Sequence, residues 1–173
     1  MRDQKSPIVF NFPNHNSLNG FIRLGWDYVS KLQWLIKVLR PFDILQSLKK
    51  SSQLYSISIS YEDQVDGDVC EDVIHSYKGL WRHIDTNRKS GFFDWRYKQH
   101  PFFEYGQVIV TKVYKKAGAI FSITENSAIR ELMIVDFFGD KKLMSSLIDE
   151  IVIVAKKYDV SYIMFPTSSR CYL

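Results

Sequence analysis

A few polar side chains stand within strongly apolar stretches, and these are the residues that could do acid–base chemistry. Asp136 lies between Val135 and Phe137, and a carboxyl group buried there would have a raised pKa. Arg96 and His100 lie in the densest aromatic patch of the chain, where a polar group that is buried needs a partner. The alternative for Asp136 is structural, as a carboxylate hydrogen-bonded to backbone at the open end of a strand.

Other common chemistries lack the residues that they need. The sequence contains no nucleophile motif, no phosphate-binding P-loop and no dinucleotide-binding loop. Cys70 and Cys171 have neither metal-site spacing nor a paired base, and no two histidines form a ligand pair on one helix face. The acidic stretch 62–68 lacks the regular oxygen ligands of a calcium loop, so we interpret it as a solvated turn.

The elements that would position the buried acid follow from hydrophobic periodicity. Residues 131–138 are almost continuously apolar, which predicts a central strand. Residues 106–124 have the pattern of a hairpin, with its turn at 115–118. Residues 141–158 carry one apolar stripe of helical period, and 160–165 predict a further strand. The expected order is hairpin, strand, helix, strand.

The N-terminal part of the chain predicts a strand, a short helix and a second strand. The apolar run 8–12 is the first strand, which Pro13 ends because it has no N–H for the ladder. Three polar residues after it can cap a helix: Asn14, Asn16 and Ser17. This helix would end at Gly25, where a positive φ is available, and a second strand would begin at 26–29.

The middle of the chain predicts another strand and two helices. Residues 34–39 are strand-like, and Asp43 can cap a helix over 44–50. Alternation over 51–60 suits a strand or a serine-rich linker, so we place a domain boundary near residue 50. A longer helix is predicted over 69–83.

A short pattern occurs twice, once near each end. Phe12-Pro13 and Phe165-Pro166 each end an apolar run and precede small polar residues, which indicates a tandem repeat. On this hypothesis residues 1–50 are the last strand-helix-strand unit of a first domain, and residues 51–173 are a second domain without its last helix and strand. We therefore expect an out-of-phase piece of a longer tandem protein. Alternatively, the opening unit completes the sheet of the domain that follows, or that of a neighbouring chain by swapping, which would make a homodimer.

The segment that begins at Asn14 resembles the last conserved segment of the GNAT family of acyl-CoA-dependent N-acyltransferases. That segment often reads strand, Asn-x-x-Ser and a helix ending in Phe-Tyr-x-Lys-x-Gly-Phe. Here Asn14-x-x-Ser17 is followed by Gly20-Phe21-Ile22-Arg23-Leu24-Gly25-Trp26. The resemblance implies an α/β (α+β) fold, with a GNAT-like central mixed, mostly antiparallel sheet flanked by helices.

Further residues are similar to one group within that family. Phe12-Pro13-Asn14 and the later Trp95-Arg96-Tyr97, His100-Pro101 and Tyr105 resemble the two-domain GNAT-like proteins of bacterial envelope polysaccharide gene clusters. This likeness implies a small-molecule amine acceptor, such as an amino sugar.

The resemblance also implies a cofactor site and catalytic groups. Backbone groups at the end of one strand and at the start of the next helix would bind acetyl-CoA or another acyl-CoA. The residues assigned to this binding are Phe137, Gly139, Lys141 and Lys142, together with Asn14, Asn16 and Ser17. Asp136 is the first choice for the general base, and Glu104 and His100 are the other catalytic candidates.

Two departures from the family pattern keep a second hypothesis open. Phe21 stands where the family has a tyrosine that protonates the departing thiolate, and a phenylalanine cannot do so. The phosphate loop retains only Gly139, and Asp140 opposes a pyrophosphate but would serve as a helix cap. The hypotheses are thus an N-acyltransferase, a catalytically silent GNAT-like domain that binds a partner, and an unrelated α/β domain.

Length and composition set the remaining limits. A chain of 173 residues has room for one domain, or one and a fraction. Its net charge of +4 suits an anionic cofactor, whereas nucleic-acid binding would need a denser basic patch, so we expect none. There is no membrane-spanning apolar run and no signal-peptide core, so a cytoplasmic location is predicted.

Overall fold

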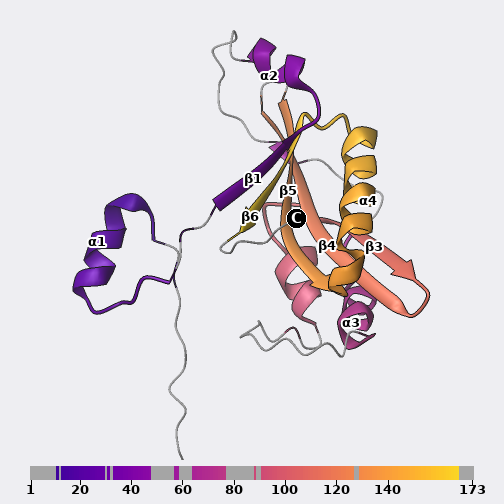
Figure 1. Ribbon diagram of the computed structural model, residues 1–173, viewed down its shortest axis with the longest axis horizontal. Coiled ribbons are helices and arrows are strands. Elements are labelled where there is room, and N and C mark those ends of the chain that lie inside the picture. Colours follow the sequence, from indigo (N-terminus) through magenta and orange to yellow (C-terminus); the bar gives the residue numbers. More distant parts are fainter. Residues whose placement is uncertain are drawn as a thin grey trace, which may run out of the picture. The chain divides into compact units, whose positions relative to one another are not determined.

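The computed structural model describes residues 11, 13–29, 31, 33–47, 57–58, 64–76, 88, 91–126 and 129–167. These residues belong to two compact units, Met1–Lys31 and Leu32–Leu173. The first unit contains the helix α1, and the second contains the sheet and the remaining helices (Figure 1). The strand predicted at 8–12 and the first copy of the Phe-Pro repeat lie almost entirely outside the described residues, so the tandem repeat and the boundary near residue 50 stay predictions.

The helix of the first unit forms where the sequence predicted it. α1 (His15–Arg23) is capped by Asn14, whose side-chain oxygen accepts a hydrogen bond from the Ser17 backbone N–H at 2.9 Å. This bond satisfies one of the backbone donors that the first helical turn leaves unpaired. The predicted cap is thus confirmed.

The end of α1 explains why no strand begins at residue 26. Gly25 has a φ of +85°, and the N–H groups of Gly25 and Trp26 donate back to Ile22 and Phe21. The Trp26 ring then packs edge-on against Phe21, with centroids 5.2 Å apart. Such a glycine-centred cap turns the chain back over the helix. The strand predicted at 26–29 is therefore wrong, whereas the predicted helix end at Gly25 is confirmed.

The second unit is built on a mixed, mostly antiparallel sheet with helices, which confirms the predicted α+β class. The described strands are β1 (Gln33–Val38), β2 (Ile57–Ser58), β3 (Gly106–Lys112), β4 (Lys115–Asn126), β5 (Ile129–Gly139) and β6 (Tyr162–Thr167). Their order is β1-β6-β5-β4-β2, with β3 also beside β4, and of the pairings only β5 with β6 is parallel. β5 is central, as its apolar sequence predicted, and β1 lies at an edge against β6 (Figure 1).

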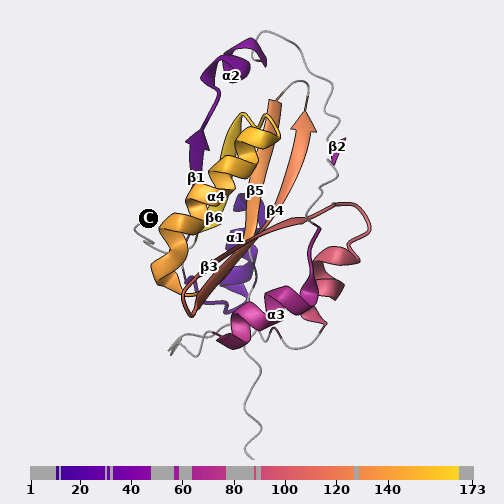
Figure 2. The same ribbon diagram turned by 90° about the vertical axis from the view of Figure 1, so that its right-hand side faces the viewer.

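The described helices of this unit are α2 (Pro41–Ser47), α3 (Gly67–Ser76), the short π-helix η1 (Asp94–Lys98), the 3-10 turn η2 (Lys141–Leu143) and α4 (Met144–Lys157). Figure 2 shows α4 lying along the sheet. α2 begins three residues before its predicted start, because Pro41 occupies the first helical position, where its missing N–H does no harm. α3 begins with a cap from Asp66, whose side chain accepts from the N–H groups of Asp68 and Val69 at 3.0 and 3.2 Å.

Two apolar cores form on the two sides of the sheet. The α4-side core joins α4 residues such as Leu147 and Ile151 to Ala119 and Phe121 of β4. The α3-side core joins Val73 of α3 and Phe93 beside η1 to Ile120 and Phe138. Adjacent residues of one strand face opposite sides, so neighbouring positions of β4 serve different cores.

The hairpin turn lies at Val113 and Tyr114 and not at the predicted 115–118. Gly118, which suggested the turn, lies inside β4 and is buried. A Cβ on Gly118 would come within 2.5 Å of the Phe138 ring, so the glycine makes room for that ring. The predicted turn is therefore wrong because the glycine is needed for packing.

Candidate functional site

A β-bulge in β5 is the first feature of the candidate site. Ile120 of β4 pairs with Asp136, whereas Phe121 pairs with Ile134, so Val135 is an extra residue on β5. Such an insertion reverses which side the following residues face. Ile134 accordingly packs in the α4-side core, while Asp136, opposite Ile120, faces the α3 side.

The two parallel strands separate immediately beside this bulge. β5 pairs with β6 only from Glu131 to Met133, opposite Tyr162 to Met164. β5 nevertheless continues to Gly139 and β6 to Thr167. From Ile134 onward, β5 has no ladder partner among the described residues of β6, and the Phe137 carbonyl accepts a hydrogen bond from Arg88 Nη1 at 3.4 Å.

Asp136 is bound by two polar side chains on the α3 side. The Tyr97 hydroxyl donates to one carboxylate oxygen at 3.0 Å, and Arg88 Nη2 lies 3.0 Å from the other. The side chains of Arg88 and Asp136 are only 16% and 12% exposed, so this ion pair is largely shielded from water. Burial raises the pKa of Tyr97, and the Asp136 charge raises it further. Tyr97 therefore keeps its proton at neutral pH and acts as a donor.

A buried thiol lies against the same core and is not a nucleophile. Cys70 donates from Sγ to the side-chain oxygen of Gln107 at 3.2 Å. Burial raises the pKa of Cys70 from 9.0 to about 12, with smaller contributions from Asp66 and Asp136. A thiol with such a pKa is protonated at neutral pH and therefore unreactive.

The other two catalytic candidates have different surroundings. His100 Nδ1 accepts hydrogen bonds from the backbone N–H groups of Phe102 and Phe103, at 3.3 and 3.1 Å. These bonds hold Nδ1 within the turn that follows His100. Glu104 follows in the same segment and is exposed. Arg96, also a candidate, is exposed on η1, next to the buried Tyr97.

In the segment predicted to bind the cofactor phosphates, a side chain of the segment itself already binds a backbone N–H group. Asp140 accepts from the Lys142 backbone N–H at 2.8 Å and lies 3.6 Å from Lys115. Its carboxylate therefore occupies the start of η2, where a pyrophosphate would need free donors. The side chains of Lys141 and Lys142 are exposed.

Gly139 and Phe137 are held by packing. Gly139 has a φ of +95°, and a Cβ there would come within 2.4 Å of the Lys116 carbonyl oxygen. The Phe137 ring packs against Phe165 of β6 with centroids 4.8 Å apart. Phe137 thus lies beside the opening between β5 and β6, whereas Gly139 packs against β4.

The remaining predicted binding residues lie in the first unit. Asn14 and Ser17 form the cap of α1, and Asn16 is exposed in its first turn. Sequence reasoning missed Arg88, Gln107 and the role of Tyr97. Tyr97 could have been noticed in the aromatic patch, but neither Arg88 nor Gln107 lies in a pattern that indicates a partner.

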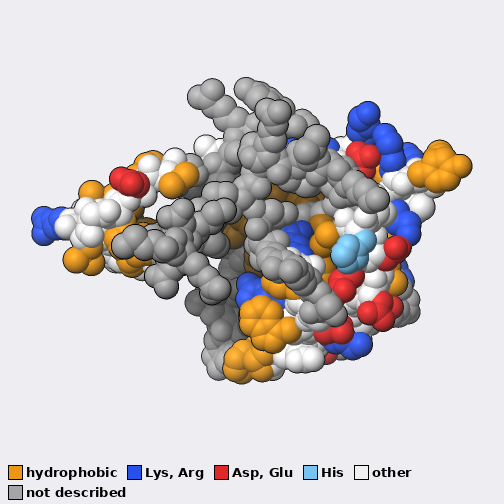
Figure 3. Space-filling view, turned by 90° about the horizontal axis from the view of Figure 1, so that it is seen from below, with side chains coloured by type: hydrophobic (Ala, Val, Ile, Leu, Met, Phe, Trp, Pro, Cys, Tyr) orange, Lys and Arg blue, Asp and Glu red, His pale blue; other side chains and the backbone are white. Residues whose placement is uncertain are grey.

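Comparisons with known proteins leave the family open. No protein-family model matches the chain, and no curated protein and no solved structure is significantly similar to it. Among the described residues, no helix is long and apolar enough to cross a membrane. In the same part of the chain, no group of three or more His, Cys, Asp or Glu side chains could hold a metal ion. Figure 3 shows acidic, basic and apolar side chains intermixed over the coloured part of the face that it views.

Proposed function

We propose that the chain is a GNAT-like N-acyltransferase that moves an acyl group from acyl-CoA to an amine, with an amino sugar as the expected acceptor. The observation that carries this proposal is the bulge at Val135, directly where β5 separates from β6. The separation leaves part of one strand edge without a ladder partner, and an extended arm with amide groups can pair with such an edge.

The polar group beside the bulge supports a proton transfer. An amine acceptor is an ammonium ion at neutral pH and must lose a proton before it attacks a thioester carbonyl. In this proposal Asp136 takes that proton, and the Tyr97 hydroxyl donates to Asp136 beside it. Tyr97 could supply the proton that the departing sulfur needs, a role that Phe21 cannot fill. The thioester itself supplies the activated acyl group.

A second candidate function rests on the cap at Asp140. Coenzyme A carries a pyrophosphate, and the carboxylate at the start of η2 would repel it and already binds the Lys142 N–H. The nucleotide end of the donor therefore does not suit this helix start. This disagreement favours a catalytically silent domain that binds a partner.

Binding and turnover of acyl-CoA separate the two candidates. An acyltransferase should be stabilised by acetyl-CoA, by about 2.7 kcal/mol at a concentration of 100 times the dissociation constant. It should also release free thiol from acetyl-CoA in the presence of glucosamine, measured with a thiol reagent. If neither stabilisation nor thiol release occurs, the silent binding domain is the better description. Asp140→Asn is a useful variant, since removal of the charge should strengthen any acetyl-CoA binding.

A further inference from the structure

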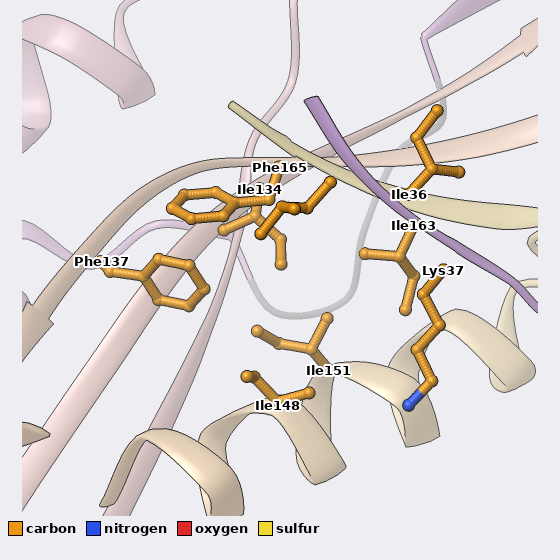
Figure 4. A pocket seen from close by; sticks show the side chains of 9 residues that line it. Ile36, Lys37, Ile134, Phe137, Ile148, Ile151, Ile163 and Phe165 are labelled. Carbon is orange, nitrogen blue, oxygen red and sulfur yellow. The ribbon is translucent and has the colours of Figure 1, made fainter. Parts of the chain in front are cut away.

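A cavity of about 390 Å³ lies between α4 and the strands at the β1 end of the sheet. Its lining consists of apolar residues and one lysine: Leu35, Ile36, Lys37, Ile134, Phe137, Ile148, Ile151, Ile163 and Phe165. Figure 4 shows Ile148 and Ile151 of α4 facing Ile134, Phe137 and Phe165 on the strands, with Lys37 at one end. We refer to this cavity as the apolar groove.

The groove exists because of how the strands diverge. β5 and β6 lose their pairing after Met133, and the Phe137 and Phe165 side chains meet across the resulting gap at 4.8 Å. Ile163 is 6% exposed, whereas Ile148 and Phe165 are only half-buried. The floor of the groove is thus core, and its walls still expose apolar surface that a ligand could cover.

The lining selects for a ligand with an apolar body. No lining side chain carries a hydroxyl, amide or carboxylate group, so a polar ligand would lose hydrogen bonds to water without replacement. An apolar cavity of about 150 Å³ can hold a benzene molecule. The apolar groove, with a volume of about 390 Å³, therefore has room for a chain of at least about eight carbons.

The single charge in the lining selects for an anionic end. Lys37 lies at the end of the groove, and among the described residues no ion pair or hydrogen bond engages its ammonium group. An ammonium in this position would pair with a carboxylate whose chain extends into the groove. We propose that the apolar groove binds a medium-chain fatty acid, with its chain along Ile148 and Phe165 and its carboxylate at Lys37.

The apolar groove shares the opening between β5 and β6 with the proposed acyl-CoA arm, but it lies on the other side of the sheet from Asp136. Ile134 and Phe137 face the α4 side of the sheet, and Asp136 faces the α3 side. Titration of fatty acids without acyl-CoA therefore tests fatty-acid binding independently of N-acyl transfer.

The first test is a chain-length series with the unaltered full chain. Butyrate, hexanoate, octanoate and decanoate would be titrated by calorimetry below their micelle concentrations. The affinity should rise about fourfold per added methylene, because each buried CH₂ contributes about 0.8 kcal/mol, until the groove is full. An affinity that does not change with chain length, or no binding of octanoate and decanoate, would overturn the proposal.

Three variants test the position of the ligand. Ile148→Trp fills the groove and should reduce octanoate binding at least tenfold. Ile153→Trp is the matched control, since Ile153 is 58% exposed on the same helix and outside the groove. Lys37→Gln should reduce the affinity for octanoate by about two- to fivefold, as expected for an exposed charge pair, and leave that for neutral octanol unchanged. Equal losses in both tryptophan variants would contradict the assignment.

A second copy of the chain is the competing occupant of the groove. Sedimentation velocity of the unaltered chain would be measured with and without octanoate. A monomer that binds octanoate supports the proposal. A dimer that octanoate does not dissociate, together with an absence of binding heat, would overturn it. If Ile148→Trp does not fold, as judged by circular dichroism, the chain-length series decides.

Discussion

Two side chains that are distant from Asp136 in the sequence bind its carboxylate. Arg88 and Tyr97 each bind one oxygen of its carboxylate, and the ion pair is largely shielded from water. Hydrogen bonds and ion pairs that are shielded from water are stronger than those at the surface. Removal of one partner leaves the other buried without its counterpart, which lowers the free energy of unfolding. Substitutions at Asp136 should therefore affect stability as well as activity.

Asp136→Asn should be the most damaging conservative substitution on the α3 side. It leaves the Arg88 guanidinium, only 16% exposed, without its anionic partner. We expect a loss of about 3 kcal/mol in the free energy of unfolding, measured with urea. If Asp136 is the general base, acyl transfer should fall by about 10²- to 10⁴-fold. Glu104→Gln, at an exposed position, is the control and should change stability by less than about 0.5 kcal/mol. Equal stability of the two variants would show that the ion pair does not matter.

The raised pKa of Cys70 should lower the stability of the chain at alkaline pH. Its pKa in the folded chain is raised from 9.0 to about 12, so between these values the folded state holds a proton that the unfolded state has lost. Stability is then unaffected below pH 9 and decreases as the pH rises above it. Cys70→Ala should flatten this decrease between pH 9 and 10, because the variant lacks the thiol. The measurement is urea unfolding at half-unit pH steps, and an unchanged slope in the variant would contradict the assignment.

At the scale of elements, the helices and strands that follow from a local apolar pattern could be predicted from the sequence. The apolar stripe of α4 and the apolar run of β5 are readable because burial follows their periodicity, with Leu147 and Ile151 fully buried. The bulge could not be predicted, since one extra residue within an apolar run leaves no mark in the sequence. Its consequence, the side of the sheet that Asp136 faces, was therefore hidden too. Tyr97 is also 39 positions away from Asp136, a distance that only the tertiary fold bridges.

Two glycines in regular elements should respond to alanine in opposite ways. A Cβ at Gly118 in β4 would lie 2.5 Å from the Phe138 ring and 2.7 Å from Ile109, so Gly118→Ala should cost about 1–3 kcal/mol. A Cβ at Gly20 in α1 meets nothing within 4 Å, and Gly20→Ala should favour that helix by about 0.5–1 kcal/mol. Thermal unfolding would measure the first and helix content by circular dichroism the second. An unchanged midpoint for Gly118→Ala would contradict the close packing.

The hairpin turn between β3 and β4 contains a residue in an unfavourable backbone conformation. Val113 has a φ of 58° and its side chain is 86% exposed, so it bears the cost of this conformation without burying much surface. Val113→Gly should therefore raise the free energy of unfolding by about 1 kcal/mol. Tyr114→Gly is the control in the same turn, because Tyr114 does not have a positive φ. A gain in both variants would assign the effect to turn flexibility instead.

At the scale of the whole chain, the boundary between the units falls just before the first strand of the sheet. β1 begins at Gln33, two residues after the first unit ends, and pairs with β6 over its full length. The sheet of the second unit thus includes residues 33–38 as an edge strand.

Two deletions distinguish these contributions. Removal of residues 1–31 leaves every described strand of the sheet in place and should cost less stability than removal of β1. Removal of residues 1–40 also takes away β1, which forms six register pairs with β6, from Gln33 with Thr167 to Val38 with Tyr162. At about 0.2–1 kcal/mol for each cross-strand pair, this loss should amount to a few kcal/mol.

The longer deletion would also remove Leu35 and Lys37 from the apolar groove, so octanoate binding should disappear with β1 and survive the shorter deletion. Urea unfolding and calorimetry on the two shortened chains measure both effects, and equal stability of the two would show that β1 is dispensable to the sheet.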